Sequence, residues 1–102
     1  MKYIKKMVDE INDEIHSAKK YAERAVELKA KGDQTSLNNS SKYKTIANQE
    51  LEHAMFIHEL TVKEIERLRG IYTPPQDMLD KWNKSHEEYV EKVAWIKQML
   101  NM

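Results

Sequence analysis

Glycine and proline, the residues that most often interrupt helices, are confined to two short stretches of this chain. Two Gly and two Pro occur among the 102 residues: Gly32 stands alone, and Gly70 is followed by Pro74 and Pro75. Each Gly comes after a charged helical pattern, as a left-handed C-terminal cap does. The rest of the chain carries no strong break signal, so the sequence predicts three long helices and no strand.

Apolar residues between these breaks recur at steps of three and four, the period of one helix face. The first segment has the stripe Ile4, Met7, Ile11, Ala18, Ala25 and Leu28, and the last has Leu79, Trp82, His86, Tyr89, Val93, Ile96 and Leu100. We predict helices at about residues 2–31, 35–69 and 74–100. The Ser/Asn-rich opening of the second, residues 36–41, is a poor helix former and is expected to fray. The predicted fold is all-α: a long antiparallel helical hairpin plus a third helix.

The overall composition narrows the classes of function. A chain of 102 residues has the size of one domain, residues 1–102, and such a small core favours homo-oligomerisation. Lys and Arg total 17 and Asp and Glu total 17, so the zero net charge argues against nucleic acid as a partner. No apolar run has the length of a signal peptide or membrane span, so we expect a soluble, cytoplasmic protein with no membrane partner. The absence of cysteine leaves carboxylate and imidazole as the ligands for any metal.

Three polar residues interrupt the predicted core stripes at one level. Glu14 lies in the middle of the first stripe, and Glu50 and His53, three apart, share the core face of the second helix. With a rise of about 1.5 Å per residue, Glu14 lies roughly 19–20 positions before the turn, and Glu50 and His53 lie about 16–20 after it. The hairpin is therefore expected to bring the three side chains together, with both carboxylates largely buried.

Two interpretations of this polar group remain open. The residues can compensate one another, or Lys and water, at a partly solvated seam. They can also bind a divalent ion, because iron, manganese and zinc accept anionic oxygen together with neutral imidazole. Bundles of the di-iron type build such sites from single Glu residues and Glu-x-x-His pairs.

The segments around these residues resemble the ferritin-like superfamily, and more closely its rubrerythrin and short half-ferritin branches. The stretch from Tyr43 to Ala54, with Glu50-x-x-His53-Ala54 after an Ile-Ala pair, is similar to the second helix of rubrerythrins. Glu14 followed seven residues later by Tyr21 resembles their first helix. The resemblance covers about the first 70 residues. It implies that Glu14, Glu50 and His53 are metal ligands, that iron is the metal, and that Tyr21 donates a hydrogen bond to these ligands. Tyr21 also lies on the core face, so a plain packing role stays open beside that one.

The chain departs from full family members because it has no second Glu-x-x-His and no cysteine-bound iron domain. The resemblance therefore implies half a site per chain, with a four-helix bundle completed by dimerisation. Its chemistry would be Fe(II) oxidation by O2 or peroxide, with no catalytic side chain apart from the ligands. Two alternatives stand beside it. The chain can be a non-enzymatic ferritin-like scaffold with a vestigial site, of the kind that phage and prophage genomes encode, or a monomer that holds one ion through the same three residues.

His86 is the rival ligand because it lies on the apolar stripe of the third helix. The antiparallel arrangement places it level with His58, roughly 9 Å along the axis from His53. We expect instead a buried histidine bonded to a neighbouring carboxylate. His16 points away from Glu14 around the first helix and is expected to be exposed.

Overall fold

The computed structural model describes residues 2–101, and these form three α-helices with no strand among them. The helices are α1 (Lys2–Lys31), α2 (Gln34–Arg69) and α3 (Gln76–Leu100). The all-α prediction is confirmed, as is the hairpin followed by a third helix. Within the described residues, none of the helices is long and apolar enough to cross a membrane.

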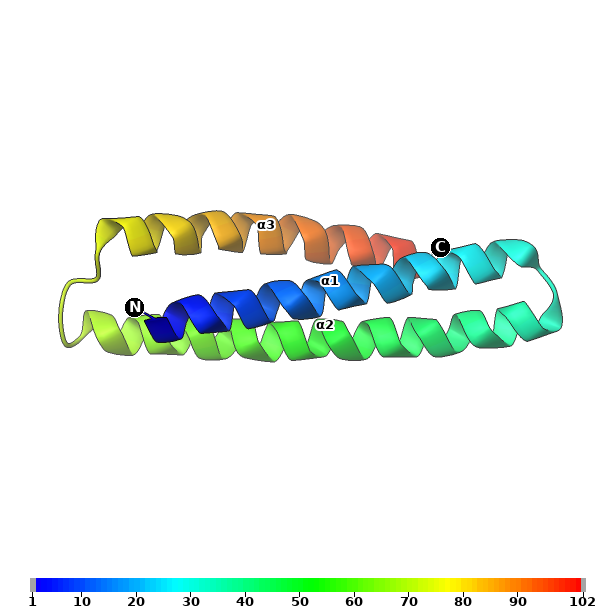
Figure 1. The fold of residues 1–102 in the computed structure, drawn as a ribbon, viewed down its shortest axis with the longest axis horizontal. Helices are drawn as coiled ribbons and strands as arrows, with labels where there is room; N and C mark the ends of the chain where they lie inside the picture. The colour runs from blue at the N-terminus through cyan, green and yellow to red at the C-terminus, as the bar shows by residue number, and fades with distance from the viewer. Residues whose placement is uncertain (1, 102) are drawn as a thin grey trace.

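The three helices form a rod with extents of 58 × 18 × 17 Å. In Figure 1, α1 and α2 run antiparallel along most of the rod, and α3 runs parallel to α1. The carboxyl end of α3 lies beside α1, whereas its amino end stands further from the hairpin. One face of the hairpin is therefore covered by α3 from the same chain.

The residues of the turn explain where α1 ends and α2 begins. Gly32 has a φ of +79°, the left-handed conformation that its lack of a side chain permits, so the predicted cap is confirmed. Asp33 is the N-cap of α2, and its side chain accepts a hydrogen bond of 3.0 Å from the backbone N–H of Ser36. This bond lowers the pKa of the Asp33 carboxyl because it stabilises the charged form.

The second break differs from the prediction in two respects. Gly70 is right-handed, with a φ of −74°, and its N–H donates to Glu66 and Arg67 carbonyls as α2 tightens at its end. The third helix begins at Gln76 and not at residue 74, with Pro75 as its N-cap. The cause is steric, since Pro75 disfavours a helical conformation at the residue before it.

The core divides into two clusters along the rod. In the larger one, α1 and α2 meet through alanines that are fully buried, and Ile96, Met99 and Leu100 of α3 pack on this seam. Its alanines are Ala18, Ala22, Ala47 and Ala54. The smaller cluster joins Ile4 and Met7 to Ile65, with Trp82 packed against it. Small residues at the seam let the backbones of the two long helices approach closely.

The serine-rich opening of α2 is helical and packed, so the expected fraying is not seen. Ser36 and Ser40 are buried, and the Ser40 hydroxyl donates a 2.6 Å hydrogen bond to the Ala25 carbonyl of α1. The low helix propensity of serine is thus outweighed by a tertiary contact.

Substitutions at Ser40 test this close contact. Ser40→Ala should lower the free energy of unfolding by about 0.5–1.5 kcal/mol through loss of the hydrogen bond. Ser40→Leu removes the same hydrogen bond and should cost at least as much, even though a cavity of about 250 Å³ lined in part by Ser40 leaves space for the larger side chain. Thermal melts followed by circular dichroism measure both. Ser41, an exposed neighbour, supplies the control Ser41→Ala. Equal melting temperatures for Ser40→Leu and wild type would contradict the packing described.

Candidate metal centre

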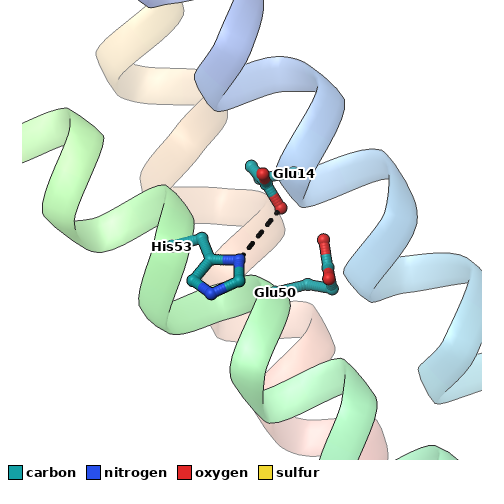
Figure 2. A group of neighbouring side chains, drawn as sticks. All are labelled: Glu14, Glu50 and His53. Carbon is teal, nitrogen blue, oxygen red and sulfur yellow. Dashed lines mark ion pairs between the residues drawn. The ribbon is translucent and has the colours of Figure 1, made fainter.

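The hairpin brings Glu14, Glu50 and His53 into one group. Each offers a ligand atom, and these atoms all lie within 4.8 Å of one another. Figure 2 shows Glu14 reaching from α1 towards Glu50 and His53, which extend from adjacent turns of α2. The predicted convergence is confirmed, and it follows from the equal rise of two uninterrupted helices on either side of a tight turn.

The contact between Glu14 and His53 leaves one carboxylate oxygen without a hydrogen bond. Glu14 Oε2 lies 3.6 Å from His53 Nδ1, beyond the usual length of a hydrogen bond. The same oxygen is buried and has no hydrogen-bond partner. A buried carboxylate oxygen without a hydrogen bond destabilises the folded state by about 1–3 kcal/mol or more. A proton or a cation bound at this atom would remove that cost.

The carboxyl group of Glu50 also favours a bound proton or cation. The pKa of Glu50 is raised, first because its protonated form hydrogen-bonds to Glu14, and then because of desolvation and the Glu14 charge. His53 opposes the shift more weakly. Two carboxylates this close disfavour each other's ionised form, and a shared proton or a bound cation relieves that repulsion.

The depth of the site differs from the prediction of largely buried carboxylates. Glu14 and Glu50 are half-buried, and His53 is exposed; the side-chain exposures are 28% for Glu14 and 56% for His53. In Figure 2 the ribbon of α3 runs behind the hairpin, while the three side chains lie nearer the viewer. The reason for the difference is that α3 covers the other side of the hairpin.

A charge-relief experiment tests the coupling between the two carboxyl groups. Because the folded-state pKa of Glu50 is raised, its stabilising contribution is present below the unfolded pKa of about 4.5 and is lost as pH rises through the folded value. Without metal, Glu50→Gln should therefore raise the melting temperature by a few degrees at pH 7 and leave it unchanged at pH 4. Glu52→Gln, at an exposed position on the same helix, is the control. A lower melting temperature for Glu50→Gln at pH 7 would contradict the repulsion.

Tyr21 lies about two helical turns from Glu14 along α1 and packs against another aromatic ring. Its ring stacks on Tyr43 of α2, with centroids 6.0 Å apart and planes 24° apart. The Arg24 guanidinium lies 5.9 Å from the centre of the Tyr43 ring. This stack forms the next layer of the hairpin towards its turn. The predicted hydrogen bond from Tyr21 to the ligands stays a prediction.

The structure corrects the expected environment of His86. Its height is as predicted, level with His58, but it is exposed, and its Nδ1 lies 2.9 Å from His58 Nε2 in a hydrogen bond. A histidine, not a carboxylate, is its partner. This role of His58 was not predicted, although its height opposite His86 was a usable signal. His16 is exposed, as predicted.

Comparison of the chain with models of protein families, with curated proteins and with solved structures gives no match. The resemblance to ferritin-like proteins therefore rests on the residues of the two hairpin helices and remains a prediction.

Proposed function

We propose that this chain is a ferritin-like metal-binding protein in which Glu14, Glu50 and His53 hold iron, with manganese and zinc as alternative ions. Two chains would pair so that each contributes half of a di-metal site. The observation that carries the proposal is Glu14 Oε2, which is buried, accepts no hydrogen bond and lies near a second carboxyl group and an imidazole. A cation at this point would satisfy all three groups together.

The donor set fits such an ion. Two carboxylates supply hard anionic oxygen, and a neutral imidazole supplies nitrogen, a combination suited to Fe(II), Mn(II) and Zn(II). One chain offers three ligand residues from two helices. A second copy related by a two-fold axis would double this to four carboxylates and two imidazoles, the ligand set of a di-metal bundle.

The surface around the ligands supports a second copy of the chain as the partner. Large apolar side chains remain exposed on the same flank of α2 as Glu50 and His53: Ile46 at 36%, Phe56 at 63% and Leu60 at 57%. Exposed apolar residues that rim a polar centre are typical of an interaction surface. An isologous interface would cover them with the equivalent residues of the partner and would close the site from water.

The expected chemistry is oxidation of Fe(II). When bound as a pair, iron would supply two electrons to O2 or peroxide. The residues of the chain would bind and orient the ions: Glu50 would bind as a carboxylate, and a bound cation would compensate the buried Glu14 oxygen that accepts no hydrogen bond. Dimerisation would exclude water.

The test is an anaerobic Fe(II) titration followed by exposure to oxygen. We expect saturable binding of one ion per chain and formation of Fe(III) at a rate above that of iron in buffer. Glu50→Ala should weaken binding by about a hundredfold, whereas Glu52→Ala, on the exposed side of the same helix, should bind as wild type does. The absence of binding of iron, manganese or zinc by the wild-type protein would reject the proposal.

A second candidate function is a ferritin-like scaffold of phage or prophage type with a vestigial site. The exposure of His53 and the half-complement of ligands favour it. Under this alternative, Glu14→Gln and Glu50→Gln raise the melting temperature and metal never changes it. Under the metal proposal, saturating metal raises the melting temperature of the wild type and not that of these variants.

A further inference from the structure

We propose that His58 and His86 form a second metal-binding site, separate from the first, which takes one borderline transition-metal ion such as Cu(II) and ties α3 to α2. The two residues are 28 positions apart in sequence and come from different helices. Nothing in the proposed function of the first site requires them. The inference therefore does not depend on that function.

The distance between the two ring nitrogens suits a shared ion. His58 Nε2 and His86 Nδ1 are 2.9 Å apart. Two imidazole ligands at about 2.0–2.1 Å from a metal, at angles between about 90° and 110°, have nitrogens roughly 2.9–3.4 Å apart. An ion bound to both nitrogens would lie off the line that joins them, so it would replace the proton of the hydrogen bond only if each ring turned by roughly 35–45° to point its nitrogen at the ion.

The surroundings hold His58 in place and favour its neutral, ligating form. Its ring stacks on Tyr89 with centroids 4.2 Å apart and planes 10° apart, and the Trp82 ring lies 5.3 Å away. Desolvation, and then the neighbouring His86, lower the pKa of His58. A metal ligand must be unprotonated, so this environment lowers the competition from protons.

The chemistry of this pair differs from that of the first site. Both donors are imidazole nitrogens, whereas the first site supplies mainly carboxylate oxygen. Nitrogen donors favour Cu(II) among the divalent ions, while carboxylates favour harder ions. Since His86 is exposed, water can fill the remaining coordination positions. The two sites should therefore select different metals.

An ion bound by the two histidines would hold the amino-terminal half of α3 in place. A groove of about 480 Å³ separates this part from α1, lined among others by Val8, Met78 and Trp82. The histidine pair links the same part of α3 to α2. An ion shared by the two rings would hold α3 against the hairpin where the apolar packing is incomplete.

Copper binding in a His53→Ala background tests the proposal, because this variant removes the imidazole of the first site. Cu(II) alone is titrated, and the bound nitrogens are counted from the hyperfine structure of the electron paramagnetic resonance spectrum. We expect one ion per chain with two imidazole nitrogens, and a higher melting temperature on saturation. Adding His86→Ala should weaken binding at least tenfold, leave at most one imidazole nitrogen and abolish the thermal shift.

The chain has four histidines, so each can be assigned. His16→Ala in the same background should bind copper as its parent does, because His16 is an isolated, exposed residue of α1. His58→Gln should weaken copper binding and lower the nitrogen count as His86→Ala does. If His58→Gln does not fold, the result for His86→Ala is sufficient, because His86 is exposed. Unchanged affinity and nitrogen count in His86→Ala would overturn the proposal, as would an equal loss in His16→Ala, which indicates non-specific surface binding.

Discussion

Replacing Leu60 with aspartate is expected to split the proposed dimer into single chains and to remove most of the proposed metal binding, although Leu60 is not one of the proposed ligands. Leu60 is 57% exposed in the single chain and lies two turns beyond His53 on the same flank of α2. Loss of leucine burial costs about 1.5–3 kcal/mol per copy, and a two-fold interface loses it twice. The dimer should be weakened by about a hundredfold or more.

Met55 provides the matched control for this substitution. It is an exposed apolar residue of α2, at 44%, but lies about 140° around the helix from Leu60. Met55→Asp should therefore leave the mass and the metal content unchanged. Sedimentation equilibrium at micromolar concentration, with metal analysis of the same samples, compares the variants. Equal behaviour of Leu60→Asp and Met55→Asp would contradict an interface across the metal face.

Replacing Ile96 with alanine is expected to cause a large loss of stability. Ile96 is fully buried where α3 packs on the alanine seam of the hairpin. Removing so many buried carbon atoms costs about 2–5 kcal/mol, because the cavity left behind closes only in part. For a chain of this size the melting temperature should fall by about 8 °C or more.

Val90, 51% exposed on the same helix, is the control for this second substitution. Val90→Ala should change the free energy of unfolding by less than about 0.5 kcal/mol. Denaturant unfolding followed by circular dichroism measures both variants. Equal losses in Ile96→Ala and Val90→Ala would mean that α3 does not dock on the hairpin through this residue.

The hairpin and the grouping of its polar residues could be predicted because both depend on regular geometry. Gly32 marks a turn that only a residue tolerant of positive φ makes easily, and the rise per residue then places Glu14 opposite Glu50 and His53. No knowledge of tertiary packing is needed for this step. It requires only that both helices continue without interruption.

Features that depend on which neighbour a side chain meets could not be predicted. The start of α3 at Gln76 reflects the second of two successive prolines, since Pro75 disfavours a helical conformation at Pro74. The N-cap pattern of Thr73 and Pro74 does not contain this effect. The exposure of His53 depends on which face α3 covers, and a hydrogen bond between His86 and His58 depends on how closely α3 approaches α2, which their equal height alone does not fix. Helical periodicity gives the direction of a side chain but not the partner at that position.

In the proposed assembly, two copies of this chain share one metal centre built from Glu14, Glu50 and His53. Native mass spectrometry of protein loaded anaerobically with Fe(II) tests it most directly, because chain number and bound ions are measured in one species. We expect a species of two chains and two ions that is absent from Glu50→Ala. A single chain carrying one ion at micromolar concentration, or a dimer that binds no metal, would contradict it.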